Sequence, residues 1–178
     1  QLSKRGCKRS QSVVFDKKLG KNVSLAKQVP VRINYTYAGK RYAKAPDEND
    51  LAIVRKIEAL DIPYWYPTDA LPDGYNTEQP VRSHGVTNVQ YFFTKRVLYE
   101  LALVYREISL VEDGRARNDL LSLLTGILNR NAYKCNRFVI NQYNPSGRIN
   151  GPKPGTLYIP SLVVEQNIAD LLEYKIPQ

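Results

Sequence analysis

The chain has 178 residues, of which 43% are hydrophobic, and a formal net charge of +9. This length suits one compact domain with its own core, and no apolar run approaches the roughly 18 residues of a membrane span. The Lys-rich start lacks the apolar segment of a signal peptide, and Cys7 and Cys135 form no disulfide or zinc pattern. We therefore expect a cytoplasmic protein with reduced thiols, no metal site and no membrane contact.

Positive charge is concentrated in two windows. Residues 1–45 contain 12 Lys or Arg and a single acid, Asp16, whereas residues 46–178 contain 14 Lys or Arg and 16 acids. No acid lies between Asp119 and Glu165, and this second window carries five cations: Arg130, Lys134, Arg137, Arg148 and Lys153. Such windows suit a phosphate backbone, whose counterions are released on binding. A solvated basic face is an equally reasonable interpretation.

The first third of the chain predicts an arm, a hairpin and a helix. Residues 1–28 are polar and basic, and we expect a basic irregular arm. Residues 29–45 alternate around Ala38 and Gly39, which predicts a β-hairpin. One face of its first strand carries Val31, Ile33, Tyr35 and Tyr37, and the other carries Arg32, Asn34 and Thr36. Acids follow Pro46 at the start of an apolar stripe, which predicts a helix over residues 46–60.

Residues 62–96 combine prolines with aromatic rings. Prolines at 63, 67, 72 and 80 remove backbone donors, so we expect an irregular segment without a long helix. Its seven aromatic residues can bury enough apolar surface to order it. Tyr64, Trp65 and Tyr66 are candidates for stacking on a nucleotide base, although filling the core is the more common role of such rings.

The last part of the chain predicts two apolar helices and a mixed end. Thr94 is a suitable N-cap for a helix over residues 95–111, which Gly114 ends, and a second helix covers residues 119–130. A strand at 137–142, a Gly- and Pro-rich loop at 144–155, a short β-like segment at 156–160 and a final helix capped by Ser161 follow. Residues 29–178 thus predict a single α+β domain with about four helices, one or two small antiparallel sheets and long ordered loops.

Several polar residues are candidate DNA contacts. Lys95 and Arg96 begin a helix, where the dipole disfavours cations, so a phosphate is a natural partner. Arg82, Ser83 and His84 bring a cation, a hydroxyl and a titratable ring together. Adjacent side chains on an extended backbone point apart, so we expect no direct bond between Ser83 and His84 and no catalytic role. Arg148 lies on a loop that can reach a groove.

The strings PYWYPTDALPDGYNTEQPVRSHGVTNVQYFFTKR and GRINGPKPGTLYIPSLVVEQNIADLLEYK carry a family resemblance. Together they resemble the central region of bacterial DNA methyltransferases that modify adenine N6 or cytosine N4, as in restriction-modification systems. The resemblance covers about residues 46–175. It implies S-adenosylmethionine as the cofactor of a full-length protein, double-stranded DNA as a partner, and a flanking catalytic domain.

The motifs that such enzymes need for chemistry are missing from the 178 residues. We find neither a Phe-x-Gly-x-Gly cofactor motif nor an Asp-Pro-Pro-aromatic catalytic motif. The resemblance therefore implies an excised, non-catalytic inner domain of the target-recognition kind, without a cofactor of its own. Two alternatives stay open: a structural scaffold between domains of the same enzyme, and a free-standing nucleic-acid-binding protein.

Overall fold

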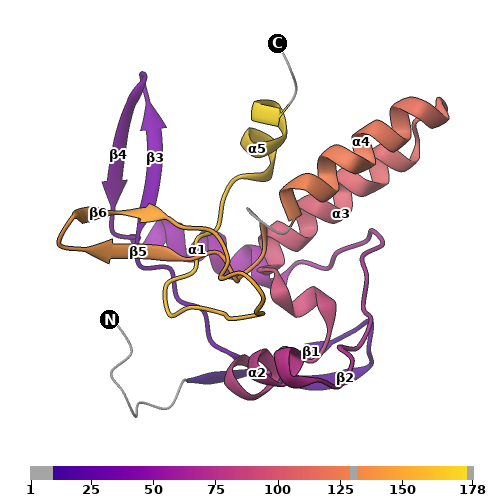
Figure 1. Cartoon of the computed structure of the whole chain (residues 1–178), viewed down its shortest axis with the longest axis horizontal. Helices are drawn as coiled ribbons and strands as arrows, with labels where there is room; N and C mark the ends of the chain where they lie inside the picture. The colour runs from indigo at the N-terminus through magenta and orange to yellow at the C-terminus, as the bar shows by residue number, and fades with distance from the viewer. Residues whose placement is uncertain (1–9, 129–131, 176–178) are drawn as a thin grey trace. The chain divides into compact units, whose positions relative to one another are not determined.

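The computed structural model describes residues 10–128 and 132–175. Within these residues it has five α-helices, one 3-10 helix and three two-stranded antiparallel sheets (Figure 1). This confirms the α+β class, with one helix and one sheet more than expected. The chain divides into two compact units, and we call residues 27–61 the hairpin–helix unit and the described remainder the main unit.

The hairpin–helix unit contains β3 (Ile33–Tyr37), β4 (Lys40–Lys44) and α1 (Glu48–Ala59). The expected turn is present, because Ala38 and Gly39 have φ of 50° and 73°, the left-handed pair that fits the twist of a hairpin. Tyr35 is paired with Tyr42 across the ladder. Helix α1 begins after Asp47, whose side chain accepts from the backbone N–H of Asp50 at 3.0 Å. The predictions of this hairpin and helix are confirmed.

The start of the main unit is a second hairpin, not an irregular arm. Strand β1 (Gln11–Asp16) pairs with β2 (Lys21–Ala26), and Gly20 adopts φ of 62° in the connecting turn. The basic composition of this segment obscured its few buried apolar residues: Val23 is buried in a cluster that includes Val86, and Leu25 packs against this cluster. The irregular prediction is wrong for residues 11–26, and residues 1–9 lie outside the described chain.

The Pro-rich segment is irregular only in its first part. It contains α2 (Tyr75–His84) and the 3-10 helix η1 (Val89–Phe92), so the prediction of an irregular segment is wrong for most of 75–92. Pro80 lies inside α2 and is buried. A short helix tolerates this proline because it loses only one backbone hydrogen bond. Gly85 ends α2 with φ of 73°, and its N–H donates to Val81 O at 2.9 Å.

The main apolar core lies where three helices meet: α3 (Lys95–Ser109), α4 (Gly114–Ile127) and α5 (Ile168–Lys175). Its buried side chains include Val97, Leu101, Ile127 and Ile168. Thr94 caps α3 as expected, and its Oγ1 accepts from Val97 N at 3.4 Å. Gly114 does not end that helix. It begins α4, because the Asp113 carboxylate accepts from the N–H groups of Arg115 and Ala116.

The C-terminal part differs from expectation in three places. Strand β5 (Phe138–Asn141) confirms the expected strand, but β6 (Asn144–Ile149) occupies the first half of the expected loop. Gly147 makes this strand possible, since with φ of 79° a Cβ there would lie 2.2 Å from the Phe138 ring. Residues 156–160 form no strand. Helix α5 follows Asn167, whose Oδ1 accepts from Ala169 N at 2.9 Å, rather than Ser161.

Candidate nucleic-acid interface

The cations at the start of α3 have internal partners. Arg96 forms an ion pair with Glu165, with 2.5 Å between Nε and Oε1. Lys95 is half-buried at the first helical position and also has an interaction within the chain. Glu165, which lies outside α3, therefore compensates part of this positive charge, and any phosphate at this end must compete with it.

Two cations of the second basic window support the fold. Lys134 turns its amine inward, where Nζ donates to Tyr91 O at 3.0 Å, and burial lowers its pKa to about 8 although Glu165 acts in the opposite direction. Arg137 donates from Nε to Gly151 O at 3.0 Å and from Nη2 to Asn150 O at 3.2 Å. Both side chains join segments of the main unit, so a phosphate contact would cost them these bonds.

The remaining cations expected at the site are exposed or undescribed. Arg148 on β6 and Lys153 in the following segment are exposed. Arg82 is exposed on α2 and lies 3.4 Å from Glu78. Arg130 falls outside the described residues. The second window thus presents fewer solvent-facing cations than its sequence suggested.

His84 and Ser83 are in direct contact, which corrects the expectation that they point apart. Both belong to α2 rather than to an extended segment, and Ser83 Oγ lies 2.8 Å from His84 Nδ1. The Ser83 hydroxyl donates its proton to Gln79 O at 2.7 Å, so it can only accept a hydrogen bond from Nδ1–H. This is the reverse of the arrangement that activates a serine nucleophile. His84 is buried and serves the fold of α2.

The three aromatic residues at 64–66 lie along α3 and the β1–β2 turn. The Tyr64 ring packs edge-on against Tyr99 at 5.8 Å between centroids, and the Trp65 ring lies 4.9 Å from that of Tyr105. Lys18 Nζ lies 4.8 Å from the centre of the Tyr66 ring. Trp65 remains 59% exposed. Trp65 therefore presents a large apolar surface to solvent, while Tyr64 and Tyr66 are half-buried.

Asp16, the only acid of the first 45 residues, is a structural side chain that the sequence did not reveal. Its Oδ2 accepts from the Tyr91 hydroxyl at 2.7 Å and from Gln90 Nε2 at 3.2 Å, while Oδ1 accepts from Leu19 N at 3.0 Å. Burial acts to raise the pKa of Asp16, but the hydrogen bonds outweigh it and the pKa is lowered. The single negative charge of this region is thus used internally.

The cations at the start of β4, Lys40 and Arg41, lie away from the acids of the described chain, whereas Lys44 at the end of the strand is paired with Asp47 and Asp50. Between Asp16 and Asp47 the sequence holds eight Lys or Arg and no Asp or Glu. All residues of β4 and most of β3 are exposed, and within the described chain no acid forms an ion pair with Lys40 or Arg41. The sequence predicted both the excess of positive charge and the hairpin, but it did not predict that the hairpin carries exposed cations as a candidate binding surface. The absence of acids from the alternating residues 32–44 could have indicated this surface.

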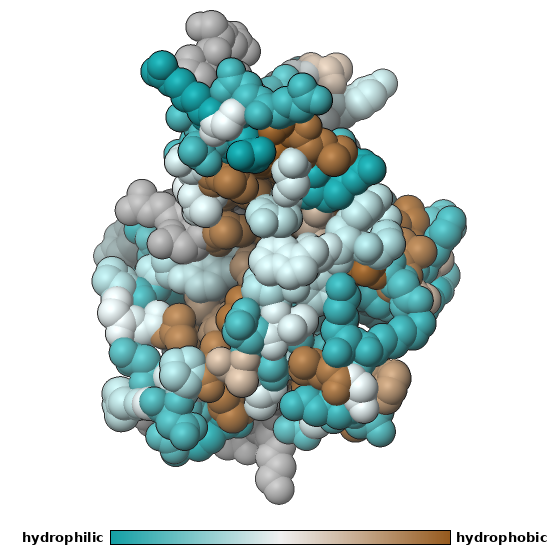
Figure 2. Space-filling view, turned by 90° about the vertical axis from the view of Figure 1, so that its right-hand side faces the viewer, coloured by the Kyte–Doolittle hydropathy of each residue, from teal (hydrophilic) through white to brown (hydrophobic). Residues whose placement is uncertain are grey.

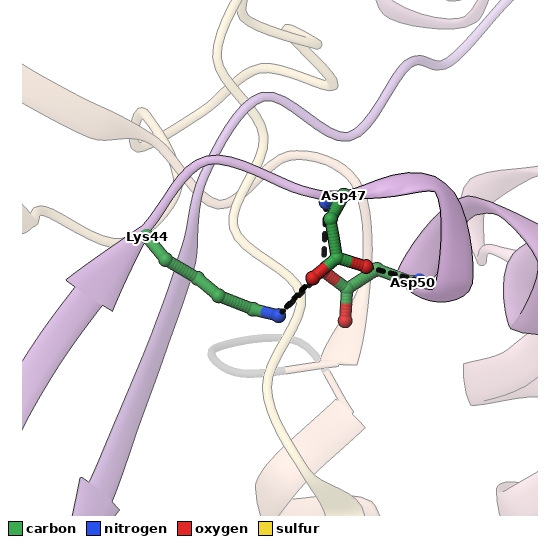
Figure 3. Close-up of polar contacts among 3 residues, drawn as sticks. All are labelled: Lys44, Asp47 and Asp50. Atoms are coloured by element: carbon green, nitrogen blue, oxygen red, sulfur yellow. Dashed lines mark hydrogen bonds and ion pairs between the residues drawn. The ribbon is translucent and has the colours of Figure 1, made fainter.

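The β3–β4 hairpin carries an exposed aromatic pair and is fixed at its base. The rings of Tyr35 and Tyr42 stack at 5.5 Å with an interplanar angle of 20°. Lys44, at the end of β4, lies 2.9 Å from Asp47 Oδ2 and 2.7 Å from Asp50 Oδ2 (Figure 3). These hydrogen bonds raise the pKa of Lys44 and join the strand to the first turn of α1. These contacts therefore fix the orientation of the hairpin relative to the first turn of α1.

Other kinds of site are not evident in the described chain. No group of three or more His, Cys, Asp or Glu among residues 10–128 and 132–175 is placed to hold a metal ion. Cys135 is free and buried, which raises its pKa to about 12 and leaves little reactive thiolate. On the face drawn in Figure 2, hydrophobic residues form separate patches between hydrophilic ones. No helix in the described ranges has the length and apolar content for crossing a bilayer.

Comparisons with known proteins add no relative: no family model, no curated protein and no solved structure matches this chain.

Proposed function

We propose that this chain is a double-stranded-DNA-binding domain that acts as a target-recognition-like part of an adenine-N6 or cytosine-N4 DNA methyltransferase. In this proposal a flanking domain of the full-length protein holds S-adenosylmethionine and performs the chemistry. The chain itself contributes affinity and orientation on the duplex.

One observation carries the DNA-binding part of the proposal: an acid-free run of cations that folds into exposed hairpins. Lys40 and Arg41 lie side by side in sequence at the start of β4, both in exposed positions. Clustered cations without neighbouring acids repel one another, so such an arrangement is costly unless a polyanion compensates it. The methyltransferase part is supported by the sequence resemblance alone.

The experiment measures binding of the chain to a duplex of mixed sequence by fluorescence anisotropy as salt is raised from about 20 to 200 mM. Five phosphate contacts would give a slope of log K against log salt on the order of −4 to −5. Replacing Lys40 and Arg41 with Gln should lower the slope magnitude by about 2. No binding at the lowest salt would contradict the proposal.

A matched control separates hairpin cations from net charge. Lys56→Gln with Arg115→Gln removes the same two charges from exposed positions on α1 and α4. We expect this variant to keep the wild-type slope. An equal loss in both double variants would show that binding reflects total charge and not the hairpins.

The exposed Trp65 favours a second candidate function, a scaffold that packs on a neighbouring domain of the same enzyme. A ring that lies 4.9 Å from Tyr105 and is still 59% exposed is typical of interface anchors. Under this candidate Trp65→Ala in the full-length enzyme lowers its thermal stability, while DNA affinity of the isolated chain stays unchanged. Loss of DNA affinity in Trp65→Ala would instead assign the ring to the DNA interface.

A further inference from the structure

We infer that the β3–β4 hairpin enters the major groove of double-stranded DNA as a two-stranded ribbon, with the face of Arg32, Asn34, Thr36 and Arg41 toward the base edges. This inference rests on the proposed DNA-binding function and deepens it. It assigns the reading of sequence to a part of the chain other than the helix ends and loops that the sequence suggested.

The dimensions of the hairpin fit the major groove. Each strand has five residues, about 17 Å in length, and the two strands lie about 4.8 Å apart. The major groove of B-form DNA is about 12 Å wide and admits a two-stranded ribbon, whereas the minor groove is only about 6 Å wide. Figure 1 shows β3 and β4 as an extended hairpin with its turn at the end away from α1.

The two faces of the ribbon differ in chemistry. Thr36 lies opposite Arg41 and Asn34 opposite Ala43, so these four share a face, which Arg32 extends by alternation. Arg binds guanine and Asn binds adenine through paired hydrogen bonds, and the Thr methyl group contacts the thymine methyl. The small Ala43 leaves room for Asn34 to approach a base edge. Arg32 Nε donates to Asn34 Oδ1 at 3.0 Å, which aligns the two side chains.

The opposite face stiffens the ribbon. The stacked Tyr35 and Tyr42 rings occupy its centre, and Lys40, paired with Tyr37 beside the turn, places a cation at the tip. Lys44 fixes the base to Asp47 and Asp50, as Figure 3 shows. In the closed hairpin these contacts hold the two strands in one conformation, which lowers the entropic cost of binding even though the unit opens more readily than the packed core.

The reading face also selects duplex DNA over other nucleic acids. A-form RNA has a deep and narrow major groove that side chains do not enter, so duplex RNA should bind only through its phosphates. Single strands would use the Tyr35 and Tyr42 rings as a stacking platform rather than the Arg and Asn face. Matched variants on the two faces can therefore distinguish the modes.

The test compares three ligands of equal length: a mixed-sequence DNA duplex, the same duplex with bulky glucosyl groups on cytosine C5 in the major groove, and a single strand. The variants are Arg41→Lys with Asn34→Ala on the reading face, and Tyr35→Leu with Tyr42→Leu on the other. Arg115→Lys is the control, since it also exchanges an exposed Arg for Lys without a change of charge. Thermal unfolding verifies that each variant folds.

We expect the glucosyl groups to weaken wild-type binding at least tenfold. The reading-face variant should lose roughly tenfold on the plain duplex, because Lys lacks the two-pronged geometry of Arg, while Arg115→Lys keeps wild-type affinity. Equal wild-type binding to plain and glucosylated duplexes, or stronger loss in the tyrosine variant than in the reading-face variant, would overturn the ribbon inference and leave the proposed function standing. Absence of duplex binding in the wild type would overturn both.

Discussion

At the residue scale, Gly85 shows how one position joins two parts of the main unit. It ends α2 in the left-handed region, and a Cβ there would lie 2.0 Å from Ser24 O on β2. The side chain would thus meet backbone that cannot move without breaking the β1–β2 ladder. The sequence does not reveal this close approach between segments 61 positions apart.

We predict that Gly85→Ala lowers the free energy of unfolding by at least about 2 kcal/mol, because backbone strain and a steric clash add together. Gly20→Ala is the control, since Gly20 has a similar φ of 62° with no atom within 4 Å of the added Cβ. It should cost about 1 kcal/mol. Urea unfolding measures both. Equal costs would mean that α2 and β2 do not approach so closely.

Lys134 gives a second residue-scale prediction, on pH. Its pKa of about 8 in the folded chain lies below the ordinary 10.5, so the unfolded chain binds more protons between these values. The stability contributed by Lys134 should therefore rise with pH from about 8 to 10.5. Tyr91, Tyr133 and Cys135 have raised pKa values, so their contributions to stability fall as pH rises. These contributions cancel when wild type is compared with a Lys134 variant at the same pH.

The measured quantity is the difference in unfolding free energy between wild type and Lys134→Met at pH 7.5 and pH 10. We expect the unfolding free energy of wild type, relative to that of the variant, to increase by roughly 2–3 kcal/mol from pH 7.5 to pH 10. Lys153→Met controls for the loss of an exposed lysine and should change stability little. A difference that is constant with pH would place the Lys134 amine in solvent.

At the element scale, local chemistry decided which parts of the fold were predictable. The β3–β4 turn and the Thr94 cap of α3 depend on residues within a few positions of one another, and both match the sequence prediction. The Asp16 carboxylate instead caps a turn and binds Tyr91, 75 residues away. Hairpin β1–β2 depends on such distant partners. These partners are not visible in its own basic sequence, which therefore predicted an irregular arm.

The candidate site shows the same contrast between local features, which the sequence predicted, and long-range contacts, which it did not. The sequence identified the excess positive charge and the faces of the β3–β4 hairpin, but it assigned DNA contacts to residues that the fold uses internally. Lys134 and Arg137 bind backbone carbonyls, and Arg96 binds Glu165. Only the folded chain shows which cations have partners. The charge pattern of the sequence gives the candidate cations, and the internal contacts of the fold then exclude some of them as DNA contacts.

The turn of the ribbon offers an element-scale prediction. Ala38 adopts φ of 50°, which costs an alanine roughly 1 kcal/mol and suits Asn far better. We expect Ala38→Asn to stabilise the hairpin–helix unit by about 0.5–1 kcal/mol, with slower amide exchange across β3 and β4. Ala38→Val is the opposing control, because a β-branched residue at positive φ should destabilise the turn. Similar exchange in all three chains would contradict the turn conformation.

At the scale of the whole molecule, the two units differ in how they are stabilised. The main unit has two clusters of buried side chains, one around Val97 and Ile127 and one around Val86 and Ile159. No residue of the hairpin–helix unit is buried, although all of its 27–61 range is described. Its stability rests on the β3–β4 ladder, the Tyr35 and Tyr42 stack and the Lys44 cluster. Elements with few buried contacts open more readily than a packed core.

This difference predicts the pattern of amide hydrogen exchange with and without DNA. In the free chain, β3, β4 and α1 should exchange at least about a hundredfold faster than the centre of α3, because opening them exposes little apolar surface. A saturating duplex at low salt should slow exchange in β3 and β4, while exchange in α3 changes little. Protection that rises in α3 and not in the hairpin would move the interface to the main unit, since a bound element is protected in proportion to its occupancy.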